Sequence, residues 1–401
     1  MLKVSAMSKI STVRVVKNNN LNAGKKILLA TLVGVLAACS ENPPSVDAPP
    51  AMVDAPPAVV DTSVHDGQAQ KVSCEPMHGM TPYCGFKNPE DLIPVPGGEK
   101  LLVSEMGEFM LDTPGALSLF DIETGGREAL MINWQNSGDT WGEKTCMAPD
   151  QALFSPHGID FMTRKDGKHE LLVVNHGGRE AVEFFELINS HGSWQLDWKG
   201  CALPPEDPFI NDVAALNDGG FFVTHMWNKS PSFEDTVARL MAGENTGWVW
   251  EWQADTGFTK VAGSQQMMPN GITVSRDANN TKLFVNIYMA SKTIKIDRAT
   301  GTVEAEFKVQ QPDNITIDDD GNLWVASHKH DPIAQTCNEV KSGPCLLPFE
   351  IVKANAETMV AEVVLSHDGE PMGYSTVALN FGGKIYMGSA HGDRIVSVEL
   401  E

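Results

Sequence analysis

One phrase recurs six times along the chain: a polar residue, a short apolar run, a turn built from Gly, Asp or Asn, and a second apolar run. The copies read EDLIPVPGGEKLLVSEMG, HGIDFMTRKDGKHELLVVNHGG, NDVAALNDGGFFVTHMWN, NGITVSRDANNTKLFVNIYMA, DNITIDDDGNLWVASH and STVALNFGGKIYMGSAHG. They begin at Glu90, His157, Asn211, Asn270, Asp313 and Ser375. This spacing, 43 to 67 residues between starts, is typical of propeller blades or solenoid units rather than of a domain with a single core.

Each copy of the phrase predicts a β-hairpin, because two apolar runs flank a turn such as Pro96-Gly97-Gly98 or Asp320-Gly321. Further strand candidates, such as ALSLFDIETGGREALMI and TIKIDRATGTVEAEFKV, lie between the copies. About four strands per unit is the content of one propeller blade. We therefore predict an all-β fold, a six-bladed β-propeller with four-stranded blades, over residues 74–401. A β-sandwich would not explain why the same order of polar residue, apolar run, turn and apolar run recurs along the chain.

Composition supports this fold and excludes one class of partner. The 401 residues are 42% hydrophobic, and 35 Gly with 24 Pro favour many short strands over long helices. There are 30 Lys and Arg against 52 Asp and Glu, a net charge of -22. Such an acidic chain argues against nucleic-acid binding, which requires clustered Lys and Arg. It suits a cation-binding protein, although net charge mainly governs solubility.

Residues 1–38 form a basic leader without acidic residues, in which Lys25 and Lys26 precede the apolar stretch ILLATLVGVLAAC. That stretch is too short for a comfortable membrane span and is typical of an export signal. It ends in Leu-Ala-Ala-Cys at Cys39, which resembles the bacterial lipobox, where the cysteine becomes the lipidated first residue. The alternative is an ordinary secretory signal with an incidental cysteine. With Ser40 next, we expect an outer-membrane lipoprotein that touches the membrane only through its N-terminal lipid anchor.

Residues 39–73 predict a tether between that anchor and the propeller. The segment repeats VDAPPA and contains few large apolar residues. Proline repeats of this kind form an extended spacer that cannot pack a core. The chain is therefore divided into a signal peptide (1–38), a lipidated tether (39–73) and a propeller (74–401).

Six further cysteines follow Cys39, an even count that suggests up to three disulfides in an oxidising compartment. A zinc site is the alternative, but no C-x-x-C spacing occurs in the chain. Proximity in sequence favours two local bridges and leaves a third pair: Cys74–Cys84, Cys337–Cys345 and Cys146–Cys201.

The hairpins bring their polar ends together at one rim of the predicted propeller. An antiparallel hairpin places the start of its first strand beside the end of its second. Four of the six hairpins close on a histidine: His176, His225, His328 and His391. One rim therefore collects carboxylates, carboxamides and imidazoles.

Five residues that open the hairpins carry side-chain oxygens, namely Glu90, Asn211, Asn270, Asp313 and Asn314. Calcium takes about six to eight oxygen ligands, and carboxylates and carboxamides supply them. Two carboxylates with three amides nearly balance the ion's charge, so the ion can still polarise a substrate oxygen. The lack of histidine in this set argues against zinc or copper. Each residue alone is more typical of a turn or strand edge, but their shared phase favours a common site.

Asp91 and Asp212 directly follow two of these residues. Successive strand residues point to opposite sides, so neither aspartate easily reaches the same ion. They would hold a second, deeper cation or accept hydrogen bonds from neighbouring backbone amides, and the sequence favours neither.

His157 and His176 are the two ends of one hairpin, so their side chains can lie close enough to exchange a proton. Histidine titrates near neutrality, which suits a general base that activates water beside an ion. The alternative is a pair of buried, hydrogen-bonded histidines. His328 closes a different hairpin and is expected to line the pocket wall.

At these residues the chain resembles the paraoxonase/arylesterase family, six-bladed propeller hydrolases that contain two calcium ions. The matching stretches are PEDLIPVPGG, SPHGIDF, ELLVVNHGG, INDVAAL, PNGITVS, LFVNIYMASKTIKID, DNITIDDDGNLWVASH and STVALNFGGKIYMG, in the family's order over roughly residues 84–399. The resemblance makes Asp91, Asp212 and the Ile159 carbonyl ligands of the structural calcium. It makes His157 and His176 the histidine dyad and His328 a wall residue. It assigns the catalytic calcium to Glu90, Asn211, Asn270, Asp313 and Asn314.

The chain departs from the family at its disulfide and after Asn211, where the family has a polar Asn-Asp-His-Tyr run and this chain has Thr224-His225-Met226-Trp227. Cys84 fits the first position of the family's disulfide, but Ser397 stands at the second, so that bridge is lost. Ser232 and Asp235 in SPSFEDTVARLM form a capping box at the start of a helix. This helix would be either a lid near the pocket mouth or simple surface packing.

The resemblance implies a calcium-dependent hydrolase of lactones or aryl esters, with a small-molecule substrate. Two other functions remain open. One is a gluconolactonase-like sugar lactonase that uses the ion alone, and the other is a non-catalytic, surface-tethered binding propeller.

Overall fold

The computed structural model describes residues 72–400 except 112, 136–137, 339 and 341. The predicted signal peptide, the lipidation site Cys39 and the tether as far as residue 71 lie outside the described residues. In the part of the chain that is described, no helix has the length and apolar character needed to cross a bilayer.

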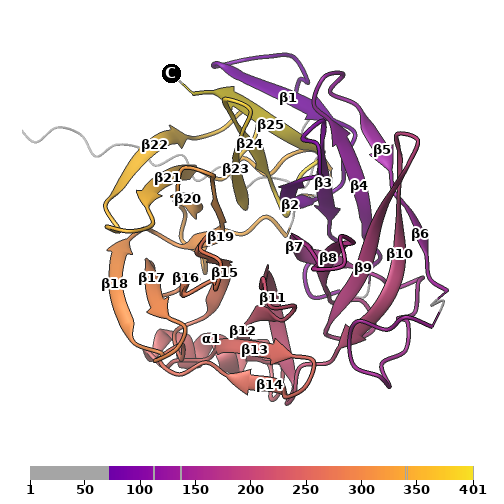
Figure 1. Cartoon of the computed structure of the whole chain (residues 1–401). Helices are drawn as coiled ribbons and strands as arrows, with labels where there is room; N and C mark the ends of the chain where they lie inside the picture. The colour runs from indigo at the N-terminus through magenta and orange to yellow at the C-terminus, as the bar shows by residue number, and fades with distance from the viewer. Residues whose placement is uncertain (1–71, 112, 136–137, 339, 341, 401) are drawn as a thin grey trace, which may run out of the picture. The chain divides into compact units, whose positions relative to one another are not determined.

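Six β-sheets stand in a ring around a central axis, which confirms the predicted propeller (Figure 1). Blade 1 contains β2 (Pro89–Pro94), β3 (Lys100–Glu105), β4 (Ala116–Asp121) and β5 (Arg127–Ala129). Blade 2 contains β7 (Pro156–Thr163), β8 (His169–Asn175), β9 (Ala181–Ser190), β10 (Ser193–Ala202) and β6 (Met131–Asn133). Blade 3 contains β11 (Pro208–Ala215), β12 (Phe221–Asn228), β13 (Trp248–Gln253) and β14 (Gly257–Lys260).

The remaining blades follow the same order from the axis outward. Blade 4 contains β15 (Pro269–Val274), β16 (Lys282–Ile287), β17 (Lys292–Asp297) and β18 (Val303–Lys308). Blade 5 contains β19 (Pro312–Ile317), β20 (Asn322–His328), β21 (Phe349–Asn355) and β22 (Ala361–His367). Blade 6 contains β23 (Val377–Phe381), β24 (Lys384–Gly388), β25 (Arg394–Glu399) and β1 (Met80–Cys84). Blade 2 departs from the predicted four strands, because β6 pairs in parallel with the outer edge of β10.

The apolar core is divided among the blade interfaces. One buried cluster lies between each pair of neighbouring blades; between blades 1 and 2 it includes Leu102, Leu171 and Phe185. Each such side chain contributes about 1.5–3 kcal/mol when fully buried. The alternating apolar residues of the repeated phrase therefore stabilise the packing of each blade on the next.

The ring closes because β1, from the start of the propeller, pairs antiparallel with β25, from its end. The buried Arg394 supports this closure by donating to the carbonyl oxygens of Ser73 (2.8 Å) and Val72 (3.2 Å). Ser397, which stands where the family has a cysteine, lies opposite Thr81 in this ladder. Closure thus depends on strand pairing rather than on a disulfide.

The three predicted disulfides are all present, Cys74–Cys84, Cys146–Cys201 and Cys337–Cys345. The predicted helix is also present as α1 (Phe233–Met241), between β12 and β13. Its N-cap is Ser232, whose hydroxyl accepts from the amide of Asp235 at 3.1 Å, as the capping box predicted.

Candidate active site

A break in strand register occurs at the start of the innermost strand in five of the six blades. The breaks lie between Pro89 and Asp91, Pro156 and Ile159, Ile210 and Val213, Pro269 and Ile272, and Pro312 and Ile315. Each break contains predicted site residues. A bulge takes a residue out of the ladder and re-aims its side chain, so these residues can face the axis. The residue before the bulged pair is a proline in four cases, a residue that strands tolerate at their first position or at bulges.

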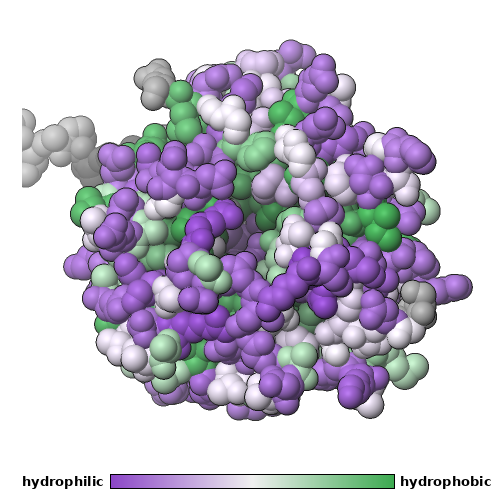
Figure 2. Space-filling view, viewed as in Figure 1, coloured by the Kyte–Doolittle hydropathy of each residue, from purple (hydrophilic) through white to green (hydrophobic). Residues whose placement is uncertain are grey.

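The bulges bring residues of five blades into one cavity of about 360 Å³. Figure 2 shows one face of the ring, hollowed near its centre and surrounded mainly by hydrophilic residues. The predicted residues that line the cavity are Glu90, His157, Asn211, Asn270 and Asp313. The fifth predicted oxygen ligand, Asn314, joins them because its Nδ2 donates to Glu90 Oε1 at 2.7 Å. Residues more than two hundred positions apart thus meet as predicted.

Four buried oxygens of this cluster have no hydrogen-bond partner among the described residues: Glu90 Oε2, Asn211 Oδ1, Asn270 Oδ1 and Asn314 Oδ1. The amide nitrogens, in contrast, are engaged. Asn211 Nδ2 donates to His157 Nε2 at 3.1 Å, and the Asn270 side chain bonds to Asp313. An unsatisfied buried acceptor costs about 1–3 kcal/mol. Oxygens that are left bare while their own amide groups are held in place fit ligands for a hard cation.

The charges of the cluster point the same way. Burial raises the pKa of Glu90 well above its usual value, and the charges of Asp91 and Asp313 add to this. Burial also raises the pKa of Asp313 to about 7. A divalent cation would favour the ionised form of both carboxylates. Within the described residues no three or more His, Cys, Asp or Glu side chains are grouped to hold a metal; the fit depends on the carboxamides.

Asp91 and Asp212 line a different cavity, of about 480 Å³, together with Ile159. Their separation from Glu90 and Asn211 agrees with the predicted alternation. Asp91 accepts from the amides of Ile159 (2.9 Å) and Leu92 (2.8 Å). Asp212 accepts from the amides of Ile272 (2.7 Å) and Val213 (2.8 Å). The hydrogen-bonded alternative is therefore present in the structure.

Burial nevertheless disfavours the ionised form of the same two aspartates. Burial raises the pKa of Asp91 to about 7, and burial followed by the Asp91 charge raises the pKa of Asp212 well above its usual value. Asp160, which sequence reasoning missed, is a third carboxylate here, and burial raises its pKa to about 6. Asp160 could have been found from the sequence, because it directly follows Ile159 in the HGID stretch. Asp160 accepts from the amides of Phe161 and Ala215, both at 2.7 Å, so the hydrogen bonds of this carboxylate are also made to backbone amides.

The predicted histidine pair is formed. The rings of His157 and His176 lie 4.8 Å apart, edge to face. His157 Nε2 faces the oxygen cluster, 3.7 Å from Glu90 Oε1. Burial, then the charge of His176, lowers the pKa of His157 well below its usual value, so this ring is neutral. Because the Asn211 amide can only donate, Nε2 is its acceptor and the ring proton is on Nδ1.

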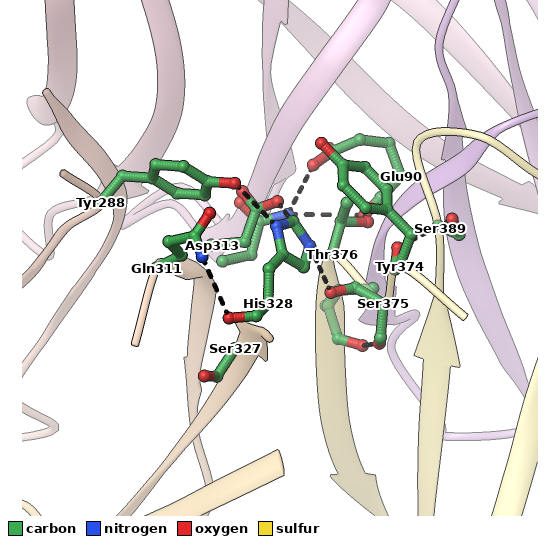
Figure 3. A network of polar contacts seen from close by, with 12 residues as sticks. Glu90, Tyr288, Gln311, Asp313, Ser327, His328, Tyr374, Ser375, Thr376 and Ser389 are labelled. Carbon is green, nitrogen blue, oxygen red and sulfur yellow. Dashed lines mark hydrogen bonds and ion pairs between the residues drawn. The ribbon is translucent and has the colours of Figure 1, made fainter. Parts of the chain in front are cut away.

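His328 lies behind the cavity wall rather than on its surface. Its Nδ1 accepts from the Tyr288 hydroxyl (3.0 Å), its Nε2 donates to the Ser375 carbonyl (3.0 Å), and its ring stacks on Tyr374 (Figure 3). Burial lowers its pKa to about 3. Its Nε2 is 3.5 Å from Asp313. The neutral imidazole thus supports Tyr288 and Tyr374, which line the cavity and were not predicted.

Apolar side chains cover the rest of the cavity. Helix α1 contributes Phe233, Val237 and Leu240, so it packs on the cavity rather than only on the surface. The loops between strands add Met106, Phe109, Met268, Met289 and Ile333. An apolar wall with a few convergent polar groups is typical of a small-molecule site.

Comparison with known proteins gives several similar structures and one family. Solved structures similar to this chain include a gluconolactonase from Xanthomonas campestris (13% identity, TM-score 0.47, 80% of this chain and 89% of that chain covered). They also include a luciferin-regenerating enzyme (13%, 0.48, 79% and 93%) and the calcium-binding protein regucalcin from Agrobacterium tumefaciens (12%, 0.42, 79% and 90%). A search of curated proteins finds no match. The family model described as Arylesterase matches residues 88–398, and the chain therefore belongs to the arylesterase family.

Proposed function

We propose that this protein is a calcium-dependent hydrolase of lactones or aryl esters. The observation that carries the proposal is the set of bare, buried oxygens beside a neutral histidine, at the base of an apolar cavity. Membership of the arylesterase family supports the class of reaction. The apolar wall favours apolar lactones and aryl esters over sugar lactones.

Two groups of residues would hold the ions. The catalytic ion would be held by Glu90, Asn211, Asn270, Asp313 and Asn314. A second ion would be held by Asp91, Asp212 and the Ile159 carbonyl. Calcium at the first site would polarise the substrate carbonyl and offset the negative charge that develops on its oxygen.

The chain's own residues activate water and exclude the bulk solvent. His157 Nε2 accepts from Asn211 Nδ2 in this structure. It would exchange that contact for the water that attacks the carbonyl carbon and take a proton from this water. The ring of His176 lies 4.8 Å from that of His157, edge to face, and would receive the Nδ1 proton of His157 when the two rings close. Tyr288, Tyr374 and the face of α1 surround the acyl or aryl group.

The test of the base is His157→Gln, which keeps a polar side chain of similar reach. We expect kcat for a lactone and an aryl ester to fall by about 10²–10⁴-fold. Calcium affinity, measured by titration calorimetry, should change little, because His157 is not in the proposed ligand set. Undiminished turnover in this variant would show that the histidine dyad has no role in the reaction. It would not contradict the proposed metal site.

Calcium dependence is tested by stripping the protein with a chelator and then restoring the ion. We expect turnover to disappear and return, and the Tm to rise with added calcium. The rise follows from linkage, about 2.7 kcal/mol at a hundredfold excess over Kd. Full activity in protein shown by elemental analysis to be metal-free would refute the calcium assignment. Loss of fold without any lactone or ester turnover in the calcium-bound protein would instead support a binding propeller.

A further inference from the structure

We propose that Glu180 is a positioning residue that completes a Glu180–His176–His157 relay. The inference rests on the function proposed above. Glu180 lies in the loop that joins β8 to β9, four residues after His176, and its side chain is 6% exposed. Its Oε2 is 3.0 Å from His176 Nδ1. No motif in the sequence marks this residue, because the contact depends on an irregular loop.

Contacts from blade 3 fix the carboxylate in place. The amide of Ile210 donates to Oε2 at 3.2 Å, and Lys229 Nζ lies 3.4 Å from Oε1. The ring of His176 is held on its other side by Phe209, on which it stacks at 4.5 Å. Phe209 in turn stacks on Trp227 at 4.4 Å. His176 is therefore confined in both its plane and its rotation.

The hydrogen bonds determine which nitrogen of each ring carries the proton. A carboxylate only accepts, so His176 carries its proton on Nδ1 and its Nε2 has a free lone pair. His157 carries its proton on Nδ1, because its Nε2 accepts from Asn211. His157 Nδ1 and His176 Nε2 are the nitrogens of the two rings that lack a hydrogen-bond partner among the described residues. The two nitrogens do not hydrogen-bond each other in this structure, so proton transfer requires the rings, whose centroids lie 4.8 Å apart, to close to hydrogen-bond distance. One is a donor and the other an acceptor, so the pair is then complementary.

This arrangement gives a path for the proton that catalysis removes from water. His157 Nε2 gains the proton while Nδ1 passes its own proton to His176 Nε2. His157 returns to a neutral ring, and His176 becomes an imidazolium protonated at Nδ1 and Nε2. The negative charge of the Glu180 carboxylate, 3.0 Å from His176 Nδ1, offsets that positive charge. Without it, the positive charge would develop in a largely buried site with no anion in contact.

The test is a double-mutant cycle with Glu180→Gln and His176→Gln, read as kcat and KM for an aryl ester. Glutamine can present an N–H to His176 Nδ1, which favours the wrong tautomer. We expect Glu180→Gln to lower kcat at least about tenfold, with KM changed less than about threefold. In the His176→Gln background the same substitution should change kcat less than about twofold. The matched control is Glu306→Gln, which makes the same change on the outer strand of blade 4, where Glu306 accepts from Lys292 at 2.8 Å, and should keep kcat within about twofold.

A second readout needs neither substrate nor calcium. Side-chain ¹⁵N spectra should show the His176 resonances, identified by their loss in His176→Gln, as a single Nδ1–H tautomer in the wild-type protein. In Glu180→Gln the tautomers should mix. An equal kcat loss in both backgrounds, or no loss in Glu180→Gln while His157→Gln is inactive, would overturn only the role of Glu180. Unchanged turnover in His157→Gln would overturn the proposed dyad as well.

Discussion

Gly158 follows His157 in the bulge of blade 2 and lies against blade 3. A Cβ atom at Gly158 would be 2.5 Å from Asp212 Oδ1, 2.6 Å from Asp212 Cα and 2.7 Å from the Asn211 carbonyl oxygen. Two of these are backbone atoms, which cannot rotate away. Gly271, which follows Asn270, packs in the same way against the backbone of Asp313 and Asn314. In blades 2 and 4, therefore, the second bulge residue must be small, because the next blade packs directly against it.

We therefore expect Gly158→Ala to separate His157 from Asn211 and to damage both activity and stability. Overpacking of this kind costs about 1–3 kcal/mol, and kcat/KM should fall at least about tenfold. Enzyme assays and thermal unfolding measure the two effects. Gly392→Ala is the control, because its Cβ would make only ordinary contacts, with Ser389 at 3.6 Å and Pro344 at 3.9 Å. Equal behaviour of the two variants would contradict the packing argument.

The meeting of the proposed ligands could be predicted residue by residue, because residues at the same position of a repeated phrase lie at equivalent positions around the axis of the ring. The alternation that separates Glu90 from Asp91 followed from strand geometry alone. The bulges could not be predicted, since an extra residue in one strand leaves the apolar pattern almost unchanged. Glu180 and Tyr374 were missed for a related reason. Both lie in loops, where sequence spacing does not determine which side chains meet.

Helix α1 is the element that most directly shapes the cavity. Its capping box determined where it begins, and its sequence predicted its existence but not which face meets the substrate. Leu240, 4% exposed, lines the cavity, whereas its neighbour Met241 is 67% exposed. The fifth strand of blade 2, β6, was not predicted. It has only three residues, too few to show a period.

Because Leu240 lines the cavity, Leu240→Ala should weaken binding of large apolar substrates more than it slows the reaction. We expect KM for a bulky aryl ester to rise about tenfold with kcat nearly unchanged, the pattern of lost uniform binding. A small lactone should be affected less. Met241→Ala provides a control on the same helix and should leave both constants unchanged. A loss confined to kcat would show that α1 acts on the chemistry and not on binding.

Across the whole molecule, stability depends on closed contacts around the ring, since each blade packs only against its neighbours. The candidate site has the same requirement, because four blades supply its proposed oxygen ligands and a fifth supplies His157. The repeat predicted six blades and a common axis. It did not predict that β1 would complete blade 6, because strand pairing between chain ends leaves no local signal. Buried histidines on several blades then make the stability of this closed ring dependent on pH.

His225 offers the clearest case, away from the proposed metal ligands. It is fully buried, stacks on Trp248 at 3.9 Å, and accepts from Trp250 Nε1 at 3.2 Å. Burial lowers its pKa to about 4, so the fold favours the neutral ring. Its contribution is complete above about pH 6.5, the value of an unfolded histidine, and is lost as pH falls toward 4. At about 1.36 kcal/mol per unit, the loss reaches at most about 3 kcal/mol.

We therefore expect His225→Gln to flatten the fall in Tm between pH 6.5 and 4, relative to the wild-type protein in the same excess of calcium. Glutamine can still accept from Trp250. The difference between the two curves therefore measures the effect of protonating His225 on the Tm. Trp250→Phe is the matched control: it removes the donor but retains the histidine, and should lower the Tm while keeping the wild-type slope. The Tm of the variant should still fall with pH to some extent, because burial also lowers the pKa of His157 and His328. Parallel curves for His225→Gln and the wild type would mean that His225 is protonated in the folded ring, and that burial in blade 3 does not exclude the charge.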